Sequence, residues 1–325
     1  MKSPYSVVVR CASALGALAI GCAEPSEDPN GRVPRERRPG ADPPLAQQVT
    51  YLGDLHQPES VKYDADQDVF FISNMVGFGS DKDGNGYIIK VSAGDLTTAK
   101  VFAEGGKNGV VLDAPKGMAI NGDTLWICDI DKLRGISRTT GLSLATIDFA
   151  PSRAVLLNDV AIGGDGAIYI TDTGILMTPK GVIHPGGDRI FRVRNGKPEV
   201  FAAGDILGRP NGIVWDKELN KIVVASFDTF KSELYTVAEG GERRLLAEGK
   251  GRFDGVEPLG KGRFMVASWN DSSVRLVGSG ASQRIADKIM QPADIGFDTR
   301  RSRLAVPVGP LNQVQLWQLP STLTN

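Results

Sequence analysis

One short sequence pattern recurs six times along this chain: a turn, a polar residue, and two closely spaced strands in which apolar and polar residues alternate. The copies span residues 58–74, 115–129, 157–172, 210–226, 253–268 and 292–307. Aligned on their turns, they place one residue of each copy at the same point, which we call the column: Glu59, Lys116, Asn158, Asn211, Asp254 and Ala293. Repeats of this kind predict a repetitive fold, because each copy buries its apolar face against the next.

Further short apolar runs follow each copy, as in GYIIKVS (86–92) and SELYTV (232–237), which gives about four strands per repeat. The column positions are separated by 57, 42, 53, 43 and 39 residues. A period near 40 with four strands per repeat is typical of a β-propeller. The sequence therefore predicts an all-β fold, a six-bladed β-propeller over residues 47–325.

The ring of blades needs a closure. The sixth repeat ends soon after VQLWQL (314–319) and so lacks an outer strand of its own. The strand at 49–55 precedes the first repeat and has no sheet to join. We expect these two segments to pair and close the ring, which removes two exposed sheet edges.

Two intervals in the repeat are long, and the extra residues lie at 74–86 and 173–188, between the second and third strands. Strand directions alternate within a blade, so the start of the first strand and the end of the second share a face. We therefore expect the column and both inserts to gather at one mouth of the central channel.

The chemistry of the column is that of hard oxygen ligands: two carboxylates and two carboxamides, beside one lysine and one alanine. Such oxygens select Ca²⁺ or Mg²⁺ over zinc or copper. Without a cation, two converging carboxylates would repel each other and one would be driven to take up a proton. A simpler interpretation stays open at this point, because Asp and Asn are also common at turns.

The units PESVKYD, LNDVAI, RPNGIVWD and FDGVE, within residues 50–319, resemble the senescence marker protein/gluconolactonase/luciferin-regenerating enzyme family. They are also similar to diisopropyl fluorophosphatase and, more distantly, to paraoxonase. In that superfamily a Glu, two Asn and an Asp bind a catalytic Ca²⁺. The resemblance thus implies that four residues hold Ca²⁺, with Mg²⁺ or another divalent cation as the alternative: Glu59, Asn158, Asn211 and Asp254.

Three departures narrow what the resemblance implies. Lactonases of the senescence-marker type take a metal-binding Asp from the end of the second strand of blade four, where this chain has Ser226, so the fluorophosphatase arrangement fits better. The Arg and Asn that such lactonases use on a sugar lactone have no match around residues 113–116. Paraoxonase's channel histidine has no match either. These departures count against a sugar lactone as the substrate.

The leading hypothesis is a calcium-dependent hydrolase that acts on a small molecule, a lactone or a related ester. The ion would act as a Lewis acid on a carbonyl or phosphoryl oxygen. As the resemblance implies, Asp254 or Glu59 would serve as general base or nucleophile. Independently of the resemblance, Lys116 would stabilise developing negative charge. The alternative is a non-catalytic propeller at the cell surface, in which a structural Ca²⁺ ties the blades together and the mouth binds a ligand.

The first 46 residues predict a targeting segment and a tether. Residues 1–22 combine a positive start with a short apolar run, and LAIGC (18–22) resembles a bacterial lipobox, after which Cys22 would be lipidated. Residues 23–46 are rich in Pro and charge and predict a disordered tether. We expect an outer-membrane or periplasm-facing lipoprotein of the bacterial cell envelope, held to the membrane only by this anchor, or alternatively a secreted protein.

Composition limits the remaining possibilities. Charge is balanced at 37 basic against 38 acidic residues, so the composition does not favour a nucleic-acid partner. We expect the protein to be a monomer. The chain has only two histidines, His56 and His184, which limits zinc chemistry. Either histidine could reach the mouth of the channel or simply belong to a turn. Asp129 and Asp172 end second strands and could support the metal ligands or pair with neighbouring blades.

Overall fold

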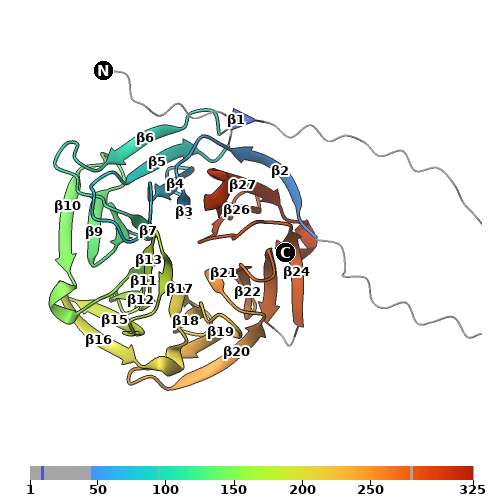
Figure 1. The fold of residues 1–325 in the computed structure, drawn as a ribbon. Coiled ribbons are helices and arrows are strands. Elements are labelled where there is room, and N and C mark those ends of the chain that lie inside the picture. The colour runs from blue at the N-terminus through green and yellow to red at the C-terminus, as the bar shows by residue number, and fades with distance from the viewer. Residues whose placement is uncertain (1–8, 11–44, 95, 279–280, 325) are drawn as a thin grey trace, which may run out of the picture.

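The computed structural model describes residues 9–10, 45–94, 96–278 and 281–324. It confirms the predicted fold, a six-bladed β-propeller that is almost entirely strand (Figure 1). The predicted signal segment and tether lie outside the described residues, apart from residues 9–10 and 45–46. Among the described residues, no helix is long and apolar enough to cross a membrane.

Each blade is an antiparallel sheet whose first strand lines the channel. The first strands are β3 (Pro58–Asp64), β7 (Pro115–Asn121), β11 (Leu157–Ile162), β17 (Pro210–Asp216), β21 (Phe253–Gly260) and β25 (Gly296–Asp298). The second strands are β4 (Val69–Asn74), β8 (Thr124–Asp129), β12 (Ile168–Asp172), β18 (Lys221–Ser226), β22 (Arg263–Ser268) and β26 (Arg303–Val308).

The outer half of each blade completes the four strands. The third strands are β5 (Tyr87–Ser92), β9 (Lys132–Ser137), β15 (Arg189–Arg194), β19 (Ser232–Val237), β23 (Ser273–Gly278) and β27 (Gln313–Gln318). The outermost strands of blades one to five are β6 (Lys100–Glu104), β10 (Ser143–Asp148), β16 (Lys197–Ala203), β20 (Arg243–Gly249) and β24 (Ala281–Asp287). Smaller elements are β1 (Val9–Arg10), β13 (Leu176–Thr178), β14 (Gly181–Ile183), η1 (Ala150–Ser152), η2 (Asp205–Leu207), η3 (Gly309–Leu311) and α1 (Ser321–Thr324).

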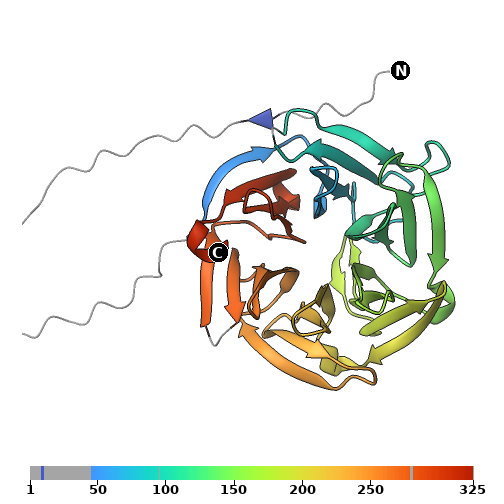
Figure 2. The same cartoon turned by 180° about the vertical axis from the view of Figure 1, so that it is seen from behind.

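The ring closes as the sequence predicts. The fourth strand of blade six is β2 (Gln47–Leu52), which pairs antiparallel with β27 on one edge and with the two-residue strand β1 on the other. The predicted range of 49–55 is shifted by two to three residues from the observed strand. Figure 2, the view from behind, shows this blue strand beside the red blade.

The apolar core is divided into clusters between consecutive blades. Phe71 and Ile88 of blade one, for example, meet Leu125 and Ile127 of blade two. Cys128 is buried in the next cluster, between blades two and three. This arrangement follows from period-two alternation, because each sheet buries one face against the preceding blade and the other against the following blade.

Glycines let the innermost strands approach closely. A Cβ on Gly255 of blade five would lie 2.5 Å from the Cα of Asp294 in blade six, and one on Gly212 would collide with the carbonyl of Asp254. A side chain at either position would push neighbouring first strands apart. The column residues of successive blades are therefore held near one another.

Candidate functional site

A β-bulge at the start of every blade aims the column residues. In β3 the register shifts between Pro58 and Val61, so Glu59 and Ser60 occupy a stretch with one residue more than the facing strand β4. The same extra residue appears at the column in the other five blades. Because a bulge turns a side chain away from the sheet's regular alternation, the column points toward the mouth of the channel.

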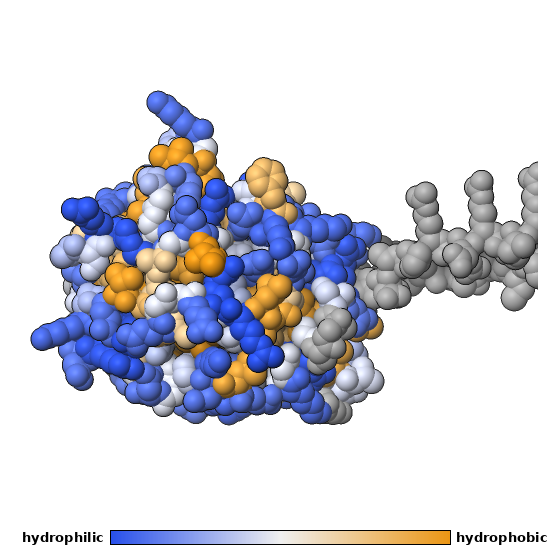
Figure 3. Space-filling view, turned by 90° about the horizontal axis from the view of Figure 1, so that it is seen from below, coloured by the Kyte–Doolittle hydropathy of each residue, from blue (hydrophilic) through white to orange (hydrophobic). Residues whose placement is uncertain are grey.

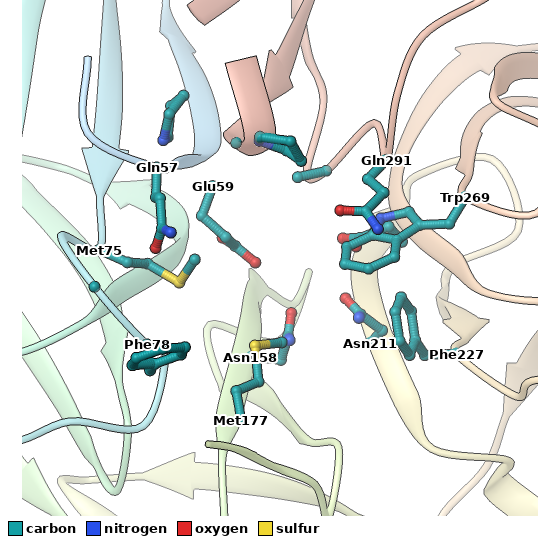
Figure 4. Close-up of a pocket in the computed structure, with 17 residues that line it drawn as sticks. Gln57, Glu59, Met75, Phe78, Asn158, Met177, Asn211, Phe227, Trp269 and Gln291 are labelled. Carbon is teal, nitrogen blue, oxygen red and sulfur yellow. The ribbon is translucent and has the colours of Figure 1, made fainter. Parts of the chain in front are cut away.

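The mouth of the channel holds a cavity of about 340 Å³. Five of the six column residues line it: Glu59, Asn158, Asn211, Asp254 and Ala293. Figure 4 shows Glu59, Asn158 and Asn211, from three different blades, pointing into the same space. The structure thus brings together the four residues predicted to bind a metal.

These four residues share an unusual feature, because each is buried and each carries an oxygen with no hydrogen-bond partner among the described residues. The oxygens are Glu59 Oε2, Asn158 Oδ1, Asn211 Oδ1 and Asp254 Oδ1. Buried oxygens are rarely left unpaired, since removal from water without compensation is costly. Four of them on one cavity floor fit a group that accepts oxygen ligands.

The charges on this floor are unbalanced as well. Burial, and then repulsion from Asp254 and Asp294, raises the pKa of Glu59 well above its usual range. Burial and the charge of Asp294 likewise raise the pKa of Asp254 well above its usual range, and the indole of Trp269 offsets part of this shift. A bound cation would relieve both effects, because it favours the ionised carboxylates.

The donor set fits a hard cation rather than zinc. The described part of the chain gathers no cluster of three or more His, Cys, Asp or Glu side chains that could hold a metal. The floor instead combines two carboxylates with two carboxamide oxygens, ligands that suit Ca²⁺ or Mg²⁺.

The structure places Lys116, the remaining column residue, away from the cavity. Its side chain is fully buried, and Nζ donates to the carbonyl oxygens of Gly79 at 2.6 Å and Ala114 at 2.9 Å. Burial lowers the pKa of Lys116, and the charge of Glu59 opposes that shift. Lys116 therefore fastens the blade-one insert to blade two and acts on Glu59 through its charge.

The walls of the cavity come from the two inserts and from two loops that the sequence did not single out. Met75 and Phe78 belong to the insert at 74–86, and Met177 to the insert at 173–188. Phe227 and Trp269 stand opposite them, edge to face, with ring centroids 5.0 Å apart. A signal for this pair exists in the sequence, because each follows the dipeptide Ala-Ser at the end of a second strand.

The residues at the ends of the second strands accept hydrogen bonds from backbone N–H groups, not from the residues proposed to bind the metal. Asp129 accepts bonds from the N–H groups of Asp113 and Ala114, and Asp172 accepts them from the segment just before β11. Ser226, at the corresponding point of blade four, accepts a bond from the N–H of Glu233. Asp129 and Asp172 therefore fix the entry into the first strand of their own blades.

Neither histidine lines the cavity. The Nδ1 atom of His56 hydrogen-bonds with the hydroxyl of Tyr87 at 2.9 Å. The Nε2 atom of His184 lies 2.6 Å from Asp188, so it braces the base of the blade-three insert. Both residues have structural roles near the mouth.

A second polar layer lies deeper in the channel, and sequence reasoning missed it. Ser60 donates to Asp294, and Lys62 pairs with Glu257 at 3.1 Å. Burial lowers the pKa of Lys62, but the negative charges of Glu257, Asp294 and Asp159 outweigh it and the net shift is upward. Here a lysine pairs directly with a carboxylate, whereas Lys116 acts on Glu59 of the cavity floor through its charge, with no ion pair between them among the described residues.

Comparisons with known proteins bear on the fold. No family model matches the sequence, and no curated protein matches it either. A solved gluconolactonase from Xanthomonas campestris aligns over 86% of this chain and 96% of its own, with a TM-score of 0.61 and 19% identity. The luciferin-regenerating enzyme aligns over 82% and 92%, with a TM-score of 0.59 and 13% identity.

A chain from the nidogen/laminin complex has the same architecture, with a TM-score of 0.54 and 15% identity over 76% of this chain and 94% of its own. The shared feature is the fold. Gluconolactonase and the luciferin-regenerating enzyme are thus among the structural neighbours, in agreement with the resemblance seen in the repeats. Function has to be inferred from the site, because one fold supports many activities.

Proposed function

We propose that this protein is a calcium-dependent hydrolase of lactones or related esters. One observation carries the proposal: four buried oxygens without hydrogen-bond partners, from four different blades, line the floor of one cavity. The gluconolactonase and luciferin-regenerating enzyme neighbours support the same class of activity.

Glu59, Asn158, Asn211 and Asp254 would hold the ion. Two carboxylates balance the charge of one divalent cation, and Ca²⁺ accepts about 6–8 oxygens, so positions remain for substrate or water. When bound, Ca²⁺ supplies a Lewis acid that polarises the carbonyl oxygen of an ester.

The chain's own groups supply the rest of the chemistry. Asp254 or Glu59 accepts a proton from the attacking water or acts as the nucleophile. Lys116 favours the ionised form of Glu59 through its charge, since it lowers the pKa of that carboxyl. The apolar walls around Phe227 and Trp269 limit the access of bulk water.

The alternative function is a propeller that binds a partner and uses the ion only to tie its blades together. The nidogen/laminin chain supports this alternative function, because that propeller was solved in a complex of two proteins. In this case the four oxygens would bind Ca²⁺ but no ester would be hydrolysed.

Thermal unfolding of the full chain in excess EDTA, then with Ca²⁺ or Mg²⁺, tests the metal. A ligand that binds only the folded state raises the midpoint by mass action. We expect a rise specific for Ca²⁺ that is lost in Asn158→Ala and Asp254→Ala. A panel of lactones and aryl esters then separates the two functions. No response to either ion removes the hydrolase mechanism, and a response without turnover favours the binding module.

A further inference from the structure

We propose that the substrate is an ester or lactone bearing an apolar alkyl or aryl substituent, rather than a polyhydroxylated lactone. This inference rests on the proposed hydrolase function and concerns the cavity walls above the four oxygens. In the reaction, the acyl C–O bond breaks while water gives OH to the acyl carbon and H to the leaving oxygen. An open-chain ester then yields a carboxylic acid and an alcohol, and a lactone yields one hydroxy acid.

The cavity separates polar from apolar groups by depth. Four of its polar side chains form the floor, and the other two, Gln57 and Gln291, are exposed at the rim. Between floor and rim the walls are mainly apolar, with Met75, Phe78, Met177, Phe227 and Trp269 around the space (Figure 4). The part of a substrate that extends beyond its carbonyl group therefore meets carbon and sulfur.

Hydroxyl groups would find few partners on these walls. A hydroxyl buried without a hydrogen bond lowers affinity by roughly tenfold or more. The indole N–H of Trp269 is a buried donor on these walls, but it faces Asp254, whose pKa it lowers. The walls therefore offer few hydrogen-bond partners to a ring with a hydroxyl on most carbons.

The size of the cavity limits the substituent. A volume of about 340 Å³ lies at the small end of the roughly 300–1,000 Å³ that ligand pockets span. The cavity therefore encloses a small ring with a short substituent. Phe78 stands at the mouth with 46% of its surface exposed, so a longer chain would pass it and reach solvent.

Hydrolysis of a graded series by the full chain with saturating Ca²⁺ tests the inference. The series is an unsubstituted five-membered lactone, the same ring with ethyl, butyl and hexyl chains, and glucono-δ-lactone. We expect kcat/KM to rise about fourfold per methylene group, the change equivalent to about 0.8 kcal/mol per buried CH₂. The gain should level off between butyl and hexyl, and glucono-δ-lactone should be the poorest substrate.

A matched pair of variants tests whether the cavity wall causes the rise in kcat/KM along the series. Met177→Gln keeps the length of the side chain but adds an amide to the cavity wall, so the gain along the series should flatten. Met290→Gln is the control, because Met290 is 52% exposed and does not line the cavity. The rise in unfolding midpoint with Ca²⁺ checks that both variants are folded.

The outcomes distinguish the inference from the proposed function. Equal rates along the series, or faster hydrolysis of glucono-δ-lactone, overturn the apolar substrate and leave the hydrolase standing. No hydrolysis of any lactone in the series or of any aryl ester in the panel overturns the hydrolase. Calorimetric titration with the matching alkyl lactams, which resist hydrolysis, then tests the apolar site without turnover. Affinity that grows with chain length supports an apolar site, and constant affinity overturns it.

Discussion

The two faces of the propeller differ in how completely they pair their buried acidic groups. On the far face, where first and second strands are joined by turns, Asp64 accepts a bond from Arg138 of the next blade at 2.8 Å. Asp298 there accepts one from Arg301 at 3.0 Å. On the mouth face, Glu59 and Asp254 each keep an oxygen without a hydrogen-bond partner among the described residues. The two acidic groups of the far face thus find their partners within the protein, whereas the two on the mouth face are suited to an added ligand.

The contrast extends to the surface. Seen edge-on, the molecule is largely hydrophilic, with apolar side chains in separate patches (Figure 3). Several exposed apolar residues stand on loops of the mouth face, among them Phe78, Phe230 and Leu311. The face with the unpaired oxygens is thus also the face with exposed apolar groups near the cavity.

The largest expected effect comes from Asp254→Asn, which removes a charge from the mouth face and keeps the shape. Hydrolysis should fall about 100- to 10,000-fold, the contribution of a positioned general base. The unfolding midpoint in EDTA should not fall, because the variant removes a buried carboxylate that Asp294 repels. A clear fall of that midpoint, measured by calorimetry, would show that Asp254 has a structural partner.

Lys62→Met tests the deeper layer, where the positive charge is built in. It leaves Glu257, Asp294 and Asp159 without a neighbouring cation, so we expect a loss of about 3 kcal/mol in the free energy of unfolding. Denaturant titration should give the same loss in EDTA and in Ca²⁺. Lys250→Met is the control: its lysine is 77% exposed, and the change should be within about 0.5 kcal/mol. A loss that Ca²⁺ repairs would place Lys62 in the metal site.

Lys116→Met separates an anchoring role from a catalytic one. Two buried hydrogen bonds to the carbonyls of Gly79 and Ala114 are lost, so stability should fall by about 2 kcal/mol. Activity should fall less than about tenfold, because the amine does not line the cavity. If kcat drops as far as in Asp254→Asn while folding is intact, Lys116 acts directly on the substrate.

The smallest effect is expected from pH on the far face. Hydrogen bonds from Arg301 and Tyr63 hold the pKa of Asp68 well below its usual range. A lowered pKa in the folded state stabilises the fold above the unfolded value of about 3.9, and this contribution is lost as pH falls further. The unfolding midpoint should therefore fall less steeply between about pH 5 and 2 in Asp68→Asn than in the parent. Parallel curves would contradict the assignment.

The fold could be predicted because its information is local and repeated. Each copy carries its own alternation and turn, so six weak signals reinforce one another. The set of Glu59, Asn158, Asn211 and Asp254 was accessible for the same reason, since aligned positions in equivalent blades must face the same mouth. Lys116 occupies the same aligned position but does not line the cavity, because its long side chain extends to the carbonyl oxygens of Gly79 and Ala114.

The sequence by itself determined the number of blades, the closure of the ring and the column of oxygens, because all three depend on periodicity along the chain. Only the tertiary structure decided what surrounds that column. Met177 and Trp269 lie far apart in the sequence, and Lys62 meets Glu257 across 195 residues. Such contacts depend on how six blades pack around one axis and where the loops between them end, and no local pattern encodes them.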